Sequence, residues 1–230
     1  MFVYNNIVMN KIAEYLAWQE QVVENPETRR RVKVKSLPPE LQKKYKPKGM
    51  VHLSKGKLEK TLKDGHFSLI SAGQNGKDEK EAKLNPDHAF FKKRHVKLQK
   101  DLEDHGLKYT EVVGVYGNKE PSFLVLHNHK KPLTGKTAGG MMVHHDGNEK
   151  ALHKIHELAV KYNQDSVLHG SHGHNSMVFT SGKNKGRRCG GHGYKEIPDA
   201  DNYYTDIPLK KGNHTKLQMD ISECFEKNLL

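Results

Sequence analysis

Sixteen histidines are the first side chains in this sequence that could do chemistry, because neutral imidazole binds metals and transfers protons. Several are close neighbours along the chain: His127 with His129, His144 with His145, His153 with His156, and His169 with His172 and His174. A zinc hydrolase helix places two histidines four residues apart with a glutamate between them. His153 and His156 are three apart and Glu157 follows both. We therefore expect solvent-facing or core-edge histidines and no metal site.

Two other stretches carry reactive groups. Cys189 follows Arg187 and Arg188, and adjacent positive charge lowers a thiol pKa, so this residue is a candidate nucleophile. The run from Thr134 to Gly140 resembles a phosphate loop but lacks the four-residue spacer and the strand-to-helix setting. The chain has only two cysteines, widely separated, which predicts two free thiols and a reducing cytoplasm.

The remaining candidates are Tyr109, Tyr116 and Glu120, in two β-rich runs separated by a Gly-Asn turn. A turn over residues 117–119 would place Tyr116 opposite Glu120, and Tyr109 opposite His127. Tyr109 and Glu120 would then lie roughly 20 Å apart, at about 3.3 Å per residue. We expect these two to share a site only across a subunit boundary.

The elements that would position these residues alternate between strand and helix patterns. They are strand 67–72, a helix opening at Asn85-Pro86, strands 109–116 and 120–126, a helix after Asn148, and strands 166–169 and 175–180. This order predicts an α+β fold: a ferredoxin-like β-α-β-β-α-β sheet with two helices on one face, plus an extra strand and terminal extensions.

Composition divides the chain into three parts. Only 34% of the 230 residues are hydrophobic, which is low for one domain that occupies the whole chain. One core of roughly 110 to 120 residues with polar extensions fits this composition better. We expect residues 1–65 to be a helical and basic arm, with helices over 7–23 and 53–62. Residues 66–182 would be the core, with a loop insert over 130–147, and residues 183–230 a glycine-rich extension.

Charge is concentrated in one segment. The net charge is +12, and residues 29–63 hold thirteen Lys or Arg against two Glu, leaving 26 basic and 25 acidic residues elsewhere. Such a block indicates a solvated arm, with weak nucleic-acid contact at most. No run of about 18 apolar residues exists to span a membrane. The first residues also lack a signal-peptide layout, so we expect a soluble cytoplasmic protein.

Five short pieces follow one another in an order that points to a family. They are Leu69-Ile70-Ser71-Ala72, Arg94-His95, Gly114-Val115-Tyr116, Glu120 and Gln164-Asp165-Ser166-Val167-Leu168. In this order the chain resembles the phage S-adenosylmethionine lyases, earlier described as hydrolases, which defeat restriction by removing the methyl donor. It also resembles a small uncharacterised bacterial domain. The likeness covers about residues 66–182.

The resemblance implies a ferredoxin-like homotrimer in the host cytoplasm, with the substrate held between subunits. It implies cleavage of S-adenosylmethionine to methylthioadenosine and homoserine lactone without a cofactor or metal. By position, Glu120 is the catalytic acidic residue, Tyr109 is the catalytic tyrosine and Tyr116 is the alternative to it. The substrate-binding residues would be Ser71, Ala72, Gln74 and Arg94.

Two other functions stay open. The chain could be a ligand-binding or virion-associated phage protein of the same fold without activity, or a basic protein associated with nucleic acid. Formation of methylthioadenosine distinguishes the enzyme from both.

Overall fold

The computed structural model describes residues 22–24, 31–33, 36–38, 40, 47–86, 88–116, 118–127, 133–136, 142–145, 149–221 and 223–224. The chain divides into two compact units, residues 1–50 and 51–230. In the first unit, β1 (Val22–Glu24) pairs with antiparallel β2 (Arg31–Lys33). The helix predicted over residues 7–23 is therefore wrong at its C-terminal end, and residues 7–21 lie outside the described part.

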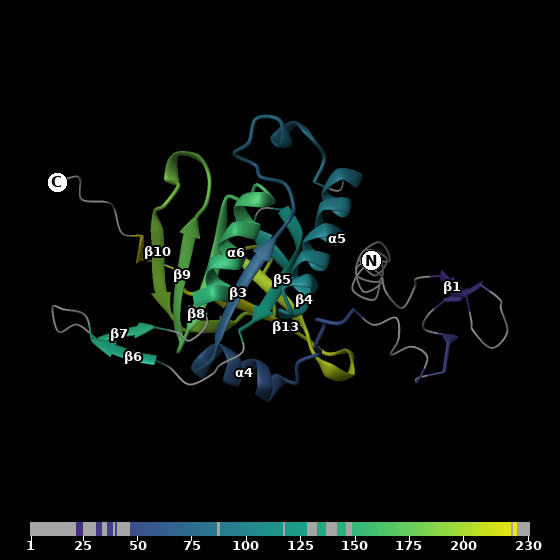
Figure 1. Cartoon of the computed structure of the whole chain (residues 1–230), viewed down its shortest axis with the longest axis horizontal. Helices are drawn as coiled ribbons and strands as arrows, with labels where there is room; N and C mark the ends of the chain where they lie inside the picture. The colour runs from purple at the N-terminus through teal and green to yellow at the C-terminus, as the bar shows by residue number, and fades with distance from the viewer. Residues whose placement is uncertain are drawn as a thin grey trace. The chain divides into compact units, whose positions relative to one another are not determined.

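The second unit contains three α-helices and three short 3-10 helices within the described residues (Figure 1). They are α4 (Lys55–Asp64), α5 (Ala89–Asp104), α6 (Glu149–Lys161) and the short 3-10 helices η2 (Glu81–Lys83), η3 (Gly182–Asn184) and η4 (Lys210–Gly212). Helix α4 begins where the Ser54 hydroxyl accepts a hydrogen bond from the Lys57 N–H, a common N-cap. Helix α5 begins after His88, three residues later than Asn85-Pro86 predicts.

The strands of the second unit form one large sheet and one small hairpin. They are β3 (His66–Ser71), β4 (Lys108–Tyr116), β5 (Asn118–Leu126), β6 (Leu133–Lys136), β7 (Met142–His145), β8 (Ser166–Ser171), β9 (His174–Phe179), β10 (Arg188–His192), β11 (Tyr194–Glu196), β12 (Tyr204–Pro208), β13 (His214–Met219) and β14 (Glu223–Cys224). The hairpin pairs β6 with β7 and lies within the predicted loop insert.

The large sheet has ten antiparallel strands in the order β11-β13-β12-β4-β5-β3-β8-β9-β10-β14. The two sides of the sheet come together at Gly193, which connects β10 on one side to β11 on the other. There the Gly193 N–H donates to the Gly173 carbonyl at 2.7 Å, and the Asp220 N–H donates to the Gly193 carbonyl at 3.2 Å. The sheet is therefore nearly closed.

Helices α5 and α6 pack against the same face of this sheet and contact each other. The Phe123 ring of β5 stacks on His95 of α5, with centroids 4.2 Å apart. Asp101 of α5 accepts hydrogen bonds from Lys161 and Tyr162 at the C-terminal end of α6. The inward faces of both helices follow the three-and-four spacing of their apolar residues.

The opposite face of the sheet is also covered. Leu124 alternates with Phe123 along β5, so it points away from α5 and α6. It belongs to a second apolar core in which α4 fills one end of the curved sheet. This core consists of Leu53, Leu58, Leu62, Phe67, Val112, Leu124, Leu168, Ile207, Leu209, Leu217 and Met219.

The predicted ferredoxin-like fold is wrong, because the described part of the second unit is a nearly closed antiparallel sheet with three α-helices. Residues 183–230, expected to be a glycine-rich extension, contribute strands to both edges of the sheet. Residues 55–64, expected to lie in the arm, contribute buried Leu58 and Leu62. A face that a ferredoxin-like sheet leaves without helices is thus buried here.

The predicted β4–β5 hairpin is present, but its register differs from the prediction by two positions. Tyr116 lies opposite Asn118, not Glu120, and Tyr109 lies opposite Val125, not His127. Glu120 instead faces Gly114 across the hairpin. The turn is tighter than the three residues that we expect from the sequence.

The expectation of two free thiols is wrong. Cys189 forms a disulfide bond, and Cys224, the only other cysteine in the chain, lies directly opposite it where β10 pairs with β14. The described residues contain no free cysteine. This bond removes Cys189 from the candidate nucleophiles.

Within the described residues, no helix combines the length and apolar character needed to cross a membrane.

Candidate functional site

The best-defined polar site lies where β3 ends and β5 begins. Glu120 is on the same face of the sheet as Ser122, which pairs directly with Ser71. The Ser71 hydroxyl lies 2.5 Å from Glu120 Oε1 and 3.1 Å from the Pro121 carbonyl, and it accepts a hydrogen bond from the Gly73 N–H at 2.9 Å. Two residues predicted from the sequence, Ser71 and Glu120, are thus in contact.

The proton count at Ser71 bears on the state of the carboxyl group. A serine hydroxyl has one proton, yet both oxygens near it, on Glu120 and Pro121, are acceptors when the carboxyl is ionised. A protonated Glu120 can donate to Ser71, which then donates to Pro121. Burial raises the pKa of Glu120, while the hydrogen bonds from Ser71 and Gly73 oppose that shift. The free site thus favours a neutral carboxyl more than an exposed glutamate would.

Gly73 makes room for this carboxyl group. A Cβ built on Gly73 would lie 2.5 Å from Glu120 Cγ and would overlap Oε1. Glu120 therefore lies directly against the backbone of the segment that follows β3. Any side chain at position 73 displaces it.

We expect Gly73→Ala to displace the Glu120 carboxyl group while leaving the rest of the fold intact. Activity that depends on Glu120 should fall to near that of a Glu120 variant, because the added methyl group occupies the same space. Gly76→Ala is a matched control, since a Cβ there meets nothing within 4 Å. Turnover and circular dichroism of both variants test this. If Gly73→Ala turned over substrate as fast as Gly76→Ala, the function would lie elsewhere in the molecule.

Tyr116 forms the exposed part of the same site. Gly114, opposite Glu120, is overlaid by the Tyr116 ring, which would lie 3.3 Å from a Cβ at that position. The Tyr116 hydroxyl is 3.4 Å from Thr205 Oγ1 on the neighbouring β12. Tyr116 is 51% exposed, so a half-open aromatic face adjoins a buried carboxyl group. Burial also raises the pKa of the Tyr116 hydroxyl.

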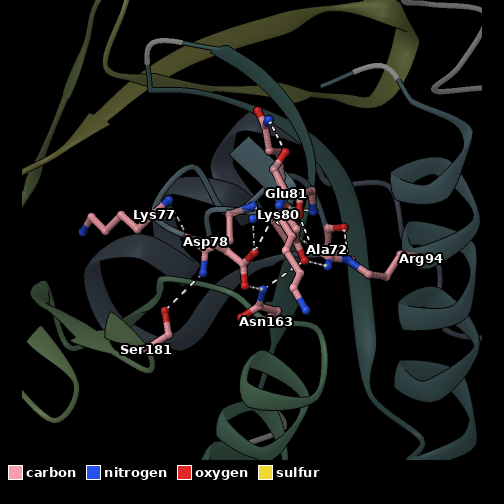
Figure 2. A network of polar contacts seen from close by, with 12 residues as sticks. Ala72, Lys77, Asp78, Lys80, Glu81, Arg94, Asn163 and Ser181 are labelled. Carbon is pink, nitrogen blue, oxygen red and sulfur yellow. Dashed lines mark hydrogen bonds and ion pairs between the residues drawn. The ribbon is translucent and has the colours of Figure 1, made fainter. Parts of the chain in front are cut away.

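Arg94, predicted to bind substrate, instead holds the segment after β3 (Figure 2). Its Nε donates to the Ala72 carbonyl at 2.8 Å, and its Nη2 donates to the Gly73 carbonyl. Its Nη1 forms a buried ion pair with Glu81 at 2.5 Å. All three guanidinium nitrogens therefore have protein partners. Arg94 fixes the backbone against which Glu120 lies.

The predicted Ala72 contributes only its carbonyl oxygen, and Gln74 folds the same segment. The Gln74 side-chain amide donates to the carbonyls of Glu81 and Leu84, both at 2.8 Å. Figure 2 shows the carboxylate of Glu81 next to Arg94 and Asn163. Asn163 Nδ2 donates to Glu81 Oε1 at 2.9 Å.

Tyr109, predicted to be catalytic, lies on the other side of the sheet and is fully buried. Its hydroxyl donates to Glu103 at 2.5 Å and accepts from Gln99 at 2.9 Å, both on α5. Its ring packs edge-on against Phe123. The structure does not bring Tyr109 to Glu120, and a buried hydroxyl with two partners is not available to a second subunit.

We expect Tyr109→Phe to lower the free energy of unfolding by about 1 to 3 kcal/mol, because Glu103 loses its buried donor. Turnover at saturating substrate should stay within about twofold of wild type, since no site group moves. Urea unfolding and steady-state rates measure the two effects separately. A large loss of turnover in a fully folded variant would return Tyr109 to the site.

Sequence reasoning missed Gly73, Glu81 and Asn163. Asn163 follows α6 with a φ of 52°, the left-handed conformation that asparagine tolerates at helix ends. The sequence could have indicated Asn163 as a helix-ending residue, because it follows the last apolar residue in the period of α6. Glu81 carries no such signal, since nothing in its surroundings marks it as the partner of Arg94.

A separate cavity, of about 510 Å³, contains none of the predicted site residues. It is lined by Lys55, Glu196, Pro198, Asp206, Leu209, Asn213, His214, Thr215 and Lys216. Lys55 pairs with Glu196 at 3.1 Å, and His214 Nδ1 lies 3.1 Å from Asp206. Its charged groups are thus largely paired with one another.

The Glu120 site offers a carboxyl group with restricted solvation, hydroxyl groups and an aromatic face, which together suit a small cationic ligand. No group of three or more metal-ligating side chains gathers within the described residues. No family model, no curated protein and no solved structure matches the chain.

Proposed function

We propose that this protein is a lyase that cleaves S-adenosylmethionine, a substrate with a sulfonium and an ammonium charge. The observation that carries the proposal is the Glu120 carboxyl group, held by Ser71 beside the half-exposed ring of Tyr116. A cation that enters this site restores the charge of Glu120, because an opposite charge lowers a raised carboxyl pKa. Aromatic faces attract onium groups as well.

The proposed reaction is intramolecular. An oxygen of the methionyl carboxylate attacks the carbon that carries the sulfonium, forming the C–O bond of homoserine lactone. The C–S bond breaks, and its electron pair neutralises sulfur in the departing methylthioadenosine. No water, metal or enzyme nucleophile takes part. The protein's contribution is to fold the substrate so that the two atoms meet.

The charge balance of this step assigns Glu120 a specific contact. The sulfonium charge decreases as the C–S bond breaks, so a carboxylate on sulfur alone would stabilise the substrate more than the transition state. The ammonium group keeps its charge throughout. Glu120 therefore binds the ammonium group, and the Tyr116 ring lies against the sulfonium.

The other parts of the proposal follow from the resemblance. The protein acts in the cytoplasm of a phage-infected cell, where loss of the methyl donor defeats restriction. A homotrimer is the proposed assembly, and analytical ultracentrifugation of the purified chain tests it. The basic segment makes at most weak contacts with nucleic acid.

Incubation of the purified chain with S-adenosylmethionine tests the function. We expect methylthioadenosine and homoserine lactone in equal amounts, detected by mass spectrometry, with no effect of a chelator. S-adenosylhomocysteine, which lacks the sulfonium, should not react. Binding of S-adenosylmethionine without products would favour the non-catalytic ligand-binding alternative. The absence of both binding and products would exclude the lyase and that alternative alike.

A further inference from the structure

We propose that His174 and His192 form a binding site for a divalent transition metal ion, separate from the Glu120 site. The two residues are cross-strand partners at the ends of β9 and β10, which are adjacent strands in Figure 1. Their ring centroids are 4.6 Å apart with the rings tilted by 59°. Both side chains are exposed, so their nitrogens are open to solvent ions.

A histidine-rich row crosses four strands at this end of the sheet. His66 pairs with Ser171, Ser171 with His174, and His174 with His192. Residues directly opposite one another share a face of the sheet, so all four side chains lie on one face. His172, in the turn before β9, contacts His66 with ring centroids 4.6 Å apart. The end of the sheet therefore carries two imidazole pairs.

The hairpin between β8 and β9 positions the first ligand. Its two turn residues, His172 and Gly173, have φ values of 47° and 78°. Two successive positive φ values indicate the tight turn that matches the twist of paired strands. This turn fixes the register that places His174 at the first position of β9.

Gly173 and Asn175 hold the second ligand. A Cβ built on Gly173 would lie 3.2 Å from His192 Cε1, so the His192 ring rests over this glycine. Buried Asn175 donates to the carbonyls of Gly193 and Asp220, at 2.7 and 3.1 Å. These bonds tie β9 to the segment after His192. Both imidazoles are thus presented from fixed backbone, which lowers the ordering cost of chelation.

The chemistry of the pair selects the class of ion. Imidazole nitrogen suits zinc, copper and nickel, whereas magnesium and calcium prefer oxygen ligands. Neither ring forms an ion pair within the described residues, so no carboxylate competes for its nitrogens. Since no third protein ligand gathers there in the described part of the chain, water would complete the coordination. Such an open site exchanges its ion readily.

Zinc titration of the full chain, followed by isothermal calorimetry, tests the site. His174→Asn and His192→Asn should each weaken the affinity of the tightest zinc site by at least about tenfold. Loss of a residue that only contacts a metal ligand already costs about this much affinity, and loss of a ligand should cost no less. His153→Asn is the control, because His153 is also exposed but lies on α6 beside Glu157 at 3.0 Å. It should leave the affinity unchanged.

Nuclear magnetic resonance of the imidazole protons locates the ion independently of affinity. Zinc should shift the signals of His174 and His192 first and together. Unchanged zinc affinity in both Asn variants, or first shifts at other histidines, would overturn the proposal. Magnesium should cause neither effect at the same concentration.

Discussion

Replacement of Glu120 by Gln should lower kcat/KM for S-adenosylmethionine by about 100-fold or more, the scale on which removal of one preorganised electrostatic group acts. The amide keeps the shape of the carboxyl group and its contact with Ser71, but it cannot carry the charge that pairs with a cationic substrate. Steady-state formation of methylthioadenosine measures the effect. Glu157→Gln, on the exposed side of α6, is the control and should behave like wild type.

The stability of the same variant separates a binding role from a structural one. Burial raises the pKa of Glu120 in the folded chain. The folded state therefore holds the proton more tightly than the unfolded state does, and this contribution is lost as the pH rises above the ordinary carboxyl pKa. At neutral pH Glu120→Gln should be at least as stable as wild type. A variant that is both inactive and less stable would point to a structural role.

Replacement of Arg94 by Leu should lower the free energy of unfolding by about 3 to 5 kcal/mol, because it leaves Glu81 as a buried charge without its partner. The segment after β3 also loses the donors to the Ala72 and Gly73 carbonyls. Urea unfolding followed by circular dichroism measures the change. Activity should fall too, since Gly73 supports Glu120.

Two further variants make the Arg94 result specific. Adding Glu81→Gln to Arg94→Leu should recover part of the lost stability, because the unpaired charge is then removed. Lys161→Ala breaks the exposed pair with Asp101 and should cost less than about 1 kcal/mol. If Arg94→Leu costs no more than Lys161→Ala, the buried pair contributes little and the segment is held by its other contacts.

The local elements were predictable because their signals are local. The helix after Asn148 follows an apolar period that burial confirms, and the strands around Tyr109 and Ser166 form where β-favouring residues predict them. The fold was not predictable in the same way, since no local pattern says which strand lies at an edge. Strand β12 adds to the edge at β4 through pairings about 90 residues apart in sequence, as between Thr205 and Gly114, and β13 then pairs with β12.

The candidate site was predictable in part for a geometric reason. The predicted hairpin register is wrong by two positions, and an even shift returns each side chain to the same face of the sheet. Glu120 therefore keeps its face, although its partner is Gly114 and not Tyr116. Tyr109 is an odd number of residues from Gly114 along β4, so its side chain lies on the opposite face of the sheet and points to α5. The geometry therefore gives no support to the catalytic role expected for Tyr109.

The disulfide between β10 and β14 makes the energetics of folding depend on where the chain resides. Closing a loop of 35 residues from Cys189 to Cys224 lowers the entropy of the unfolded chain, worth about 3 to 4 kcal/mol at room temperature. Disulfides persist mainly in oxidising compartments and are rare in the cytosol. In the cytoplasm proposed for the reaction the folded sheet would lack this covalent restraint, and β14 would be held by its few backbone pairings alone.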